Sequence, residues 1–360
     1  MKTVMKAFGE LFIDETKKGI KLQTMEYKKQ GSHIIVDQGK NQIAGYTDIK
    51  KGLFEDVPVI IFGDHTRVIK YVDQPFFLGA DGVKILRSKD KNANYKYLYY
   101  ALRNANIPDT GYNRHFKWLK ETKINYPSVA RQDEIVRILD KLSDIIDRRK
   151  TQLQGLDSLI KARFVEMFGD CSNMVLLNDL CLIITDGTHQ PPKFQEKGIP
   201  FILVSNLSNN TVTYNTEKYI SEETYNELYK RTPIEPGDLL LSTVGSYGHP
   251  AVVTEDIRFL FQRHIAYLRP KRELVNSFYL HSALLAPDGQ RQIEEKVKGI
   301  AQKTLNLSEI RKIMIPLPKM EEQDKFAAFV HQVDKSKVVV QKALDEAQIL
   351  FDSLMQKYFG

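Results

Sequence analysis

The most regular pattern of hydrophobic and polar positions in the chain is an apolar stripe that occurs twice. In residues 131–167 apolar side chains recur mostly at intervals of three and four, with charged residues between them. This spacing predicts a long amphipathic helix. Residues 322–359 have the same pattern, and a shift of 191 residues places Gln132-Asp133 on Gln323-Asp324. The sequence therefore predicts an internal repeat, and a repeat constrains the architecture more than any local motif.

The two predicted helices are expected to pair with each other. A helix of ~38 residues is about 57 Å long, more than one globular segment of ~125 residues can cover. The other copy has a matching length and period, so the stripes predict a coiled coil. Each helix begins where its own globular segment ends, which favours an antiparallel pair with the globular segments about 50–60 Å apart. The residues predicted to form the coiled-coil core are Ile138, Leu142, Ile145, Leu153, Leu156, Leu159, Phe329, Val333, Val340, Leu344, Phe351 and Leu354.

The segments before each long helix have mixed strand and helix patterns. Runs rich in β-branched and aromatic residues, bounded by Gly, Asp and Pro, predict strands, and helical spacing predicts one helix in each segment. The predicted strands are 32–37, 57–62, 67–71, 83–86, 200–205, 238–243, 251–254 and 265–269, and the predicted helices are 94–103 and 275–286. The predicted fold class is α+β, with two mixed α/β domains, two long antiparallel helices and a pseudo-twofold repeat. The expected boundaries are 1–126, 127–170, 171–316 and 317–360.

The net charge of +7 lies outside the long helices. Residues 131–170 carry eight basic and eight acidic side chains, and residues 319–360 carry six and seven, so the rest of the chain carries the excess. A basic excess on globular segments suits a polyanionic partner such as DNA. Two similar segments at a fixed separation suit duplex DNA, which repeats every ~34 Å, and therefore a site with two separated halves.

Composition narrows the class of protein further. No apolar run is long enough for a membrane span, and residues 1–12 lack the apolar core of a signal peptide, so a cytoplasmic location is expected. The two cysteines, Cys171 and Cys181, form neither a disulfide framework nor a zinc-ligand set.

Short segments in both halves resemble the specificity subunit of type I restriction–modification systems. In the first half they include Ile60-Ile61-Phe62-Gly63-Asp64-His65-Thr66, Leu78-Gly79-Ala80-Asp81-Gly82-Val83 and Gly111-Tyr112-Asn113-Arg114-His115-Phe116. In the second half they include Asp238-Leu239-Leu240-Leu241-Ser242, Gln262-Arg263-His264-Ile265-Ala266 and Ile315-Pro316-Leu317-Pro318. Each segment is short, but their order around two long helices is specific, and the resemblance covers essentially the whole chain.

The resemblance implies a non-catalytic DNA-recognition subunit. Residues 1–126 and 171–316 would be target-recognition domains, each reading one half of an interrupted site, and the helices would act as spacers. The helices would also dock two modification subunits, which bind S-adenosylmethionine and methylate adenine, and restriction subunits could join the complex. This chain itself would bind no cofactor, in keeping with its lack of a P-loop, a glycine-rich loop for S-adenosylmethionine or an Asn/Asp-Pro-Pro-aromatic motif.

Base readout in the major groove requires side chains that address base edges, such as Arg and Lys for guanine, Asn and Gln for adenine, and Thr for the thymine methyl. Predicted loops carry such residues in both halves, whereas Asp64, Gly79, Asp81 and Gly82 are typical of turns that maintain the fold. The candidate DNA-contacting residues are Gln38, Lys40, His65, Asn113, Arg114, His115, Lys117, Thr188, His189, Ser246, Tyr247, Gln262, Arg263, Gln302 and Lys303.

Two other functions are compatible with the residues. Pro108-Asp109 followed by Glu121-Thr122-Lys123 imitates a nuclease motif, in which carboxylates hold Mg²⁺ and a lysine orients the attacking water. Solvated charges produce the same pattern easily in a chain with 27% charged residues. The second alternative is a coiled-coil scaffold that binds only proteins. No histidine pair has metal-ligand spacing, so no metal site is predicted.

Overall fold

The computed structural model describes residues 4–79, 81–299 and 302–360. The chain forms two compact units: unit 1 comprises Met1–Lys150 and Lys342–Gly360, and unit 2 comprises Thr151–Gln341. Ala80 and Ile300-Ala301, which belong to segments considered in the sequence, lie outside the described residues. Among the helices of the described part, none is both long and apolar enough to cross a membrane.

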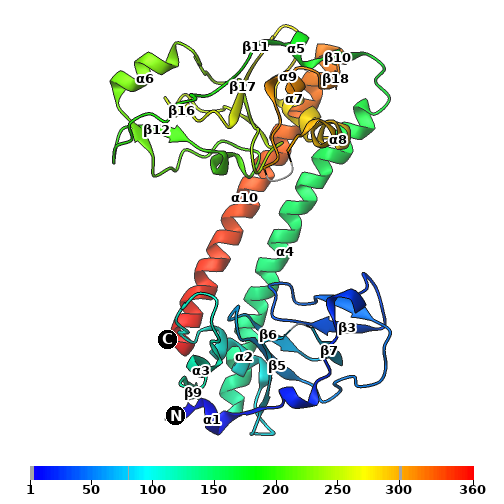
Figure 1. Ribbon diagram of the computed structural model, residues 1–360, viewed down its shortest axis with the longest axis vertical. Helices are drawn as coiled ribbons and strands as arrows, with labels where there is room; N and C mark the ends of the chain where they lie inside the picture. The colour runs from blue at the N-terminus through cyan, green and yellow to red at the C-terminus, as the bar shows by residue number, and fades with distance from the viewer. Residues whose placement is uncertain (1–3, 80, 300–301) are drawn as a thin grey trace. The chain divides into compact units, whose positions relative to one another are not determined.

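Both predicted long helices are present, α4 (Val129–Phe168) and α10 (Met320–Phe359) (Figure 1). In unit 1 the beginning of α4 and the end of α10 share one core, which contains Leu139 and Phe351. In unit 2 the end of α4 packs on the beginning of α10, where the rings of Phe164 and Phe326 lie 5.5 Å apart. The contacts inside each unit therefore confirm the antiparallel pairing.

The other elements of unit 1 precede α4. They are β1 (Val4–Ala7), α1 (Phe8–Leu11), β2 (Phe12–Asp14), η1 (Thr16–Lys18), η2 (Thr24–Glu26), β3 (His33–Val36), β4 (Gly45–Thr47), β5 (Val59–Gly63), β6 (Ile69–Val72), β7 (Phe76–Leu78), β8 (Val83–Ser88), α2 (Tyr95–Arg103), α3 (Phe116–Leu119) and β9 (Lys123–Tyr126).

The other elements of unit 2 lie between the long helices. They are β10 (Met174–Leu176), α5 (Leu177–Leu180), β11 (Cys181–Asp186), β12 (Ile199–Ile202), η3 (Val204–Leu207), β13 (Tyr219–Ile220), α6 (Glu222–Tyr229), β14 (Leu239–Ser242), β15 (Pro250–Val252), β16 (Leu260–Phe261), β17 (Ile265–Pro270), α7 (Ser277–Leu285), α8 (Pro287–Lys296), α9 (Leu307–Ile310) and β18 (Met314–Pro316).

The two units have the same sheet topology, which confirms the internal repeat. Unit 1 has a four-stranded sheet in the order β2-β8-β5-β6, and its counterpart in unit 2 is β11-β17-β14-β15. The three-stranded sheets β4-β3-β7 and β13-β12-β16 also correspond, and each contains one parallel strand pair. The small pairs β1-β9 and β10-β18 lead into α4 and α10 respectively.

The central strand of each larger sheet is buried on both faces. In β5, Ile60 and Phe62 point into a core shared with α2 and α4, whereas Val59 and Ile61 point toward the smaller sheet. This division follows from the alternation of side chains along a strand. Burial on both faces explains why the segment is a continuous apolar run in the sequence.

Two of the predicted coiled-coil core residues are not in the core. Ile145 and Leu159 of α4 are 43% and 47% exposed. The apolar stripe is wider than the surface that the partner helix covers, and the core uses their neighbours Ile146 and Ile160. Val333, Val340 and Phe351 are buried as predicted, and the remaining seven residues are partly buried: Ile138, Leu142, Leu153, Leu156, Phe329, Leu344 and Leu354.

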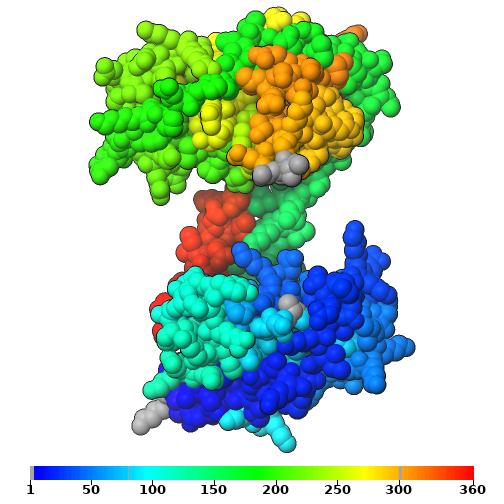
Figure 2. Space-filling model, viewed as in Figure 1, coloured from blue at the N-terminus to red at the C-terminus, as the bar shows by residue number. Residues whose placement is uncertain are grey.

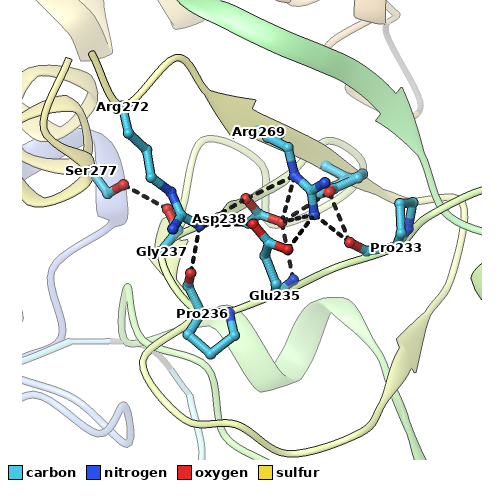
Figure 3. A network of polar contacts seen from close by, with 9 residues as sticks. Pro233, Glu235, Pro236, Gly237, Asp238, Arg269, Arg272 and Ser277 are labelled. Atoms are coloured by element: carbon cyan, nitrogen blue, oxygen red, sulfur yellow. Dashed lines mark hydrogen bonds and ion pairs between the residues drawn. The ribbon is translucent and has the colours of Figure 1, made fainter. Parts of the chain in front are cut away.

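A buried ionic network holds the sheet of unit 2 together (Figure 3). Asp238, at the start of β14, is fully buried and pairs with Arg269 of β17 at 3.0 Å. The hydroxyl of Tyr267 donates a hydrogen bond to the same carboxylate at 2.8 Å. Unit 1 has an equivalent on β8, where Arg87 pairs with Glu15 at 2.6 Å. A buried charge is tolerated only when it is paired and hydrogen-bonded, as both of these are.

Candidate nucleic-acid interface

Three loops of unit 1 meet around the side chain of Gln38, which follows β3. Its amide nitrogen donates to the carbonyl oxygen of Asp81 (2.9 Å), and its amide oxygen accepts from the backbone N–H of His65 (3.2 Å). Its backbone carbonyl accepts from the hydroxyl of Thr66 (2.6 Å). Gln38 was predicted to read bases, but in this structure its side chain joins the loops that carry other candidate residues.

The loop after β5 organises the segment that leads to α3. Asp64 is almost fully buried, and its carboxylate accepts from the backbone N–H of Phe116 (2.7 Å). Its carbonyl oxygen accepts from the backbone N–H of His115 (2.8 Å) and lies 3.0 Å from Nδ1 of that residue. The role of Asp64 is therefore to maintain the fold, as its turn-forming character predicted.

The prediction that His115 contacts DNA is wrong for this structure. Its side chain is fully buried, and both ring nitrogens are engaged by neighbouring groups of the protein. Nδ1 faces the carbonyl of Asp64, and Nε2 lies 3.3 Å from the hydroxyl of Thr110. His115 therefore supports the exposed loop before α3 and does not face solvent.

The loop before α3 and the first turn of α3 present two basic residues, and Tyr112 of this loop forms an aromatic pair with His65. The ring of Tyr112 is 87% exposed and stacks on His65, with the centroids 4.7 Å apart and the planes 11° apart. Arg114 and Lys117 are exposed nearby in the sequence, as is Asn113, whose side-chain amide donates to the carbonyl of Thr110. In the space-filling view the segment that carries this loop, coloured between cyan and green, lies at the surface of unit 1 (Figure 2).

Tyr112 was not among the predicted contacts, although its segment was. A tyrosine that exposes one ring face offers a stacking surface of the kind that suits bases and sugars. In the sequence, the position of Tyr112 between Gly111 and Asn113 could have indicated that it is a candidate contact. Gly111 has a φ of +74°, a conformation that marks a tight turn and brings the next side chain to the loop tip.

A basic hollow of ≈410 Å³ lies beside the β6 side of the larger sheet of unit 1. Its charged lining comprises Lys40, Arg67, Lys70 and Arg103. Arg67 pairs with Asp109 at 2.6 Å, and the nearly buried Lys70 pairs with Asp37 at 3.4 Å. Burial lowers the pKa of Lys70. Four cations against two carboxylates leave the hollow positive, so it is suited to a phosphate group.

The loops of unit 2 bring several predicted residues around a second hollow of ≈320 Å³. Its lining includes Asp186, Arg263, His264, Gln302 and Asn306. Partial burial, followed by the charge of Arg263, lowers the pKa of His264 below its usual value. The hollow therefore offers a guanidinium, an amide and an imidazole, which are groups that recognise base edges.

Thr188 and Gln262 connect the loops at the edge of this hollow. The backbone N–H of Thr188 donates to the carbonyl of Phe261, and the backbone N–H of Arg263 donates to the carbonyl of Thr188. The hydroxyl of Thr188 donates to the carbonyl of Gln190 (3.0 Å). The exposed His189 lies 3.0 Å from a carboxylate oxygen of Asp186.

The remaining candidates of unit 2 form a separate polar cluster. The hydroxyl of Tyr247 donates to Glu294, and the ammonium of Lys303 pairs with the same carboxylate at 2.9 Å. The hydrogen bond from Tyr247, followed by that from Lys303, lowers the pKa of Glu294, and the bond to Glu294 raises the pKa of Lys303. Ser246 is exposed beside this cluster in the sequence. Tyr247 and Lys303 thus lie together at the surface, with the charge of the lysine balanced locally.

The structure gives no support to the nuclease alternative. One carboxylate oxygen of Asp109 accepts from the backbone N–H of Gly111 (3.0 Å), and the other pairs with Arg67. Both oxygens are thus engaged by groups of the protein. Within residues 4–79, 81–299 and 302–360, no three His, Cys, Asp or Glu side chains are grouped in a way that could hold a metal ion.

Comparison with known proteins identifies the family. The family described as "Type I restriction modification DNA specificity domain" matches the chain twice, at residues 4–157 and 172–347. The chain belongs to this type I DNA specificity family. The two matches coincide with the two halves of the internal repeat and together cover most of the sequence.

Individual members of the type I specificity family are similar over most of their length. The specificity subunit of the type I restriction enzyme EcoBI from Escherichia coli is 27% identical over 352 residues, covering 85% of this chain and 73% of that protein. The EcoR124I/EcoR124II specificity subunit from the same organism is 25% identical, covering 83% and 79% respectively. The crystal structure of the S subunit of a type I restriction–modification system from M. genitalium matches with a TM-score of 0.61 and 16% identity, covering 100% of this chain and 96% of that one, and shows the shared fold.

Membership of the type I specificity family confirms the predicted class of function. The chain is a non-catalytic DNA-recognition subunit, and catalysis belongs to other subunits of the complex. The surface described above therefore requires groups that bind and distinguish DNA, and no residues that break or form bonds. Of the fifteen predicted DNA contacts, only His115 is fully buried.

Proposed function

We propose that each unit reads one half of an interrupted DNA site. Target-recognition domain 1 would comprise residues 1–126 and domain 2 residues 171–316. The observation that carries the proposal is the repeated topology: two equivalent sheets, each followed by one of two antiparallel helices, with polar and basic loops in both units. The two sets of loops differ in sequence, so the two half-sites would differ as well. The subunit would act on DNA in the cytoplasm.

The proposed contact groups differ in their role. Arg114 on the loop before α3, Lys117 in α3, and Arg263 on a loop of unit 2 are exposed cations. Arginine addresses the O6 and N7 atoms of guanine with two parallel hydrogen bonds, and lysine also contacts phosphates. Gln302 and Asn113 supply amides of the kind that pair with adenine. Lys40 and the basic hollow beside it would contact the phosphate backbone, which sets affinity and not sequence.

We expect Arg114→Ala and Arg263→Ala to relax different halves of the recognised sequence. Each should cost about 1–3 kcal/mol of discrimination at one base position if the arginine pairs with guanine. The measurement is sequencing of random duplex fragments that bind the full chain together with a methyltransferase subunit of a type I system. The wild-type protein should enrich two half-sites separated by a constant gap.

The exposed residue Lys193 of unit 2 provides a control, because Lys193→Ala removes a charge without removing a guanidinium. Relaxation of the same half-site by both arginine variants would contradict the assignment of one half to each unit. Enrichment of a single uninterrupted motif, or of no shared motif, would contradict the proposed function itself. In that outcome the protein-only scaffold would be the better interpretation.

We further propose that the long helices dock two modification subunits, which bind S-adenosylmethionine and methylate adenine after the base leaves the duplex. Restriction subunits could then join. The support is apolar surface that the helix pair does not cover. Val338 and Val339 of α10, both in unit 2, are 70% and 69% exposed. Exposed apolar residues grouped on a helix are typical of protein interfaces.

Charge on this apolar surface should weaken docking. We expect Val338→Asp combined with Val339→Asp to lower affinity for the modification subunit by more than about tenfold, or ~1.4 kcal/mol, because interface anchors exceed this value when lost. Thermal unfolding should change little, since both side chains are exposed. Isothermal titration with the modification subunit measures the effect, and Ser336→Asp, exposed on the same helix, is the control. Unchanged affinity in the double variant would place the docking surface elsewhere.

A further inference from the structure

Each long helix is tied to the globular part before it by a buried glutamine. In unit 1 this residue is Gln132, in the first turn of α4, and its side chain is fully buried. Its amide oxygen accepts from the backbone N–H of Asn94 at 3.0 Å. Its amide nitrogen donates to the carbonyl of Pro127, also at 3.0 Å. One side chain therefore joins the helix to the start of α2 and to the end of the segment that leads out of β9.

Asp133, the residue after Gln132, attaches α4 to the start of α2 by a second hydrogen bond. Asn94 is the N-cap of α2, and its side-chain oxygen accepts from the backbone N–H groups of Lys96 and Tyr97. Its side-chain nitrogen donates to the carboxylate of Asp133 at 2.8 Å. The capping residue of α2 is thus bonded to two successive residues of α4. We call Asn94, Gln132 and Asp133 the joint of unit 1.

Unit 2 has the same joint, built from Asn276, Gln323 and Asp324. The amide oxygen of Gln323, again fully buried, accepts from the backbone N–H of Asn276 at 2.9 Å. Its amide nitrogen donates to the carbonyl of Pro318 at 3.0 Å. Asn276 caps α7 and donates to the carboxylate of Asp324 at 2.9 Å. Every hydrogen bond of the first joint therefore has a counterpart in the second.

The hydrogen bonds of the joint constrain the direction of the helix more strictly than apolar contacts do. Apolar packing is non-directional, so a helix held only by packing can slide or rotate at small cost. Hydrogen bonds to a fixed donor and a fixed acceptor weaken steeply when distance or angle changes. A buried glutamine that loses either partner is left unsatisfied, so the arrangement tolerates one geometry. The joint therefore fixes the direction of each helix relative to the domain before it.

We propose that the two joints determine how strictly the protein selects the length of the gap between the half-sites. This inference rests on the proposed function. Lengthening the gap by one base pair moves the second half-site by about 3.4 Å and turns it by about 34° around the duplex axis. A domain held at a fixed angle to its helix cannot follow that turn, whereas a domain on a loosened joint can. Asn94, Gln132 and Asp133, with their counterparts, are positioning residues and contact no base.

The test uses the full chain with a type I modification subunit and random-sequence duplex DNA, with sequencing of the bound fragments. The double variant Gln132→Ala with Gln323→Ala should enrich the same two half-sites as wild type but with a wider range of gaps. The preference for the native gap over gaps one base pair longer or shorter should fall several-fold. Gln154→Ala, which truncates an exposed glutamine of α4, should leave the gap distribution unchanged.

A second pair of variants distinguishes loss of the joint from loss of folding. Asp133 and Asp324 are exposed, so alanine at both positions should leave the protein folded and still widen the gap distribution. Asparagine at both positions keeps an acceptor oxygen and should restore the wild-type distribution. Base preference within each half-site should stay unchanged in these variants, whereas a change that only destabilised the protein would alter it.

Two outcomes would overturn the inference. One is an unchanged gap distribution in alanine variants that fold and bind DNA. The other is an equal loss of binding at every gap length. Failure of the proposed function gives a different result, because the wild-type protein would then enrich no interrupted motif at all.

Discussion

Replacing Asp238 with alanine is expected to lower the free energy of unfolding of unit 2 by about 3–5 kcal/mol. The carboxylate is fully buried and is the common partner of Arg269, Tyr267 and the backbone N–H of Glu235. Its removal leaves the mostly buried guanidinium of Arg269 with the carboxylate of Glu235 at 3.4 Å and the carbonyl of Pro233 as its remaining partners. The penalty arises from an uncompensated charge and unsatisfied hydrogen bonds, and not from the loss of volume.

The effect should be confined to one unit. Chemical denaturation of the full chain, followed by intrinsic fluorescence and circular dichroism, should show an early transition that the wild type lacks. The half-site read by unit 1 should still be recognised by the native part. Asp256→Ala removes an exposed carboxylate of the same unit and should leave the unfolding curve unchanged. A loss below about 1 kcal/mol for Asp238→Ala would mean that the network contributes little, as for an exposed ion pair.

Replacing Phe326 with alanine should destabilise the helix pair in unit 2 by about 3–5 kcal/mol, the range for large-to-small changes in a packed core. Phe326 is fully buried, and its ring makes edge contacts with Phe164 at 5.5 Å, Phe168 at 5.6 Å and Tyr279 at 6.3 Å. The change removes both buried apolar area and three aromatic contacts, and it leaves a cavity that rigid neighbours cannot fill.

Equilibrium unfolding in urea measures this loss, and Phe326→Leu is the matched control because it keeps most of the volume and should cost less than half as much. Val165→Ala, at an exposed position of α4, tests whether the loss of stability comes from the core and not from a change in helix propensity. Equal destabilisation by Phe326→Leu and Phe326→Ala would show that ring contacts matter more than cavity formation. A change within experimental error for Phe326→Ala would contradict the packing described here.

The elements that sequence patterns predicted correctly are those with a strong period. The stripes of α4 and α10 extend over many turns, so the existence and pairing of these helices did not depend on any single residue. The repeat predicted that the two segments fold alike, but not their strand order. Three strands of each larger sheet were predicted, namely β5, β6 and β8 in unit 1 and β14, β15 and β17 in unit 2, whereas the edge strands β2 and β11 were not. The segments of β5 and β14 were recognised as continuous apolar runs.

Contacts between residues distant in the sequence could not be predicted. The burial of His115 depends on the carbonyl of Asp64, 51 residues earlier in the chain. The echo of Gln132-Asp133 in Gln323-Asp324 was visible, but its partners Asn94 and Asn276 lie 38 and 47 residues before the glutamines. Ile145 satisfied the periodicity as well as Ile146 did, and only the width of the partner helix decided which was covered. Base contacts depend on loop geometry, and loop sequences have no periodic pattern from which that geometry could be predicted.

The division of the chain into units has a consequence for its synthesis. The core of unit 1 includes Ala347, Phe351 and Met355, which are translated after every residue of unit 2, whose last residue is Gln341. Domains generally fold as units while the chain is being made. The globular part that is translated first is therefore the last to close, and until then Leu139 and Ile146 of α4 lack the side chains that cover them. A nascent chain in which these residues of α10 have not yet been translated would present this apolar surface to chaperones.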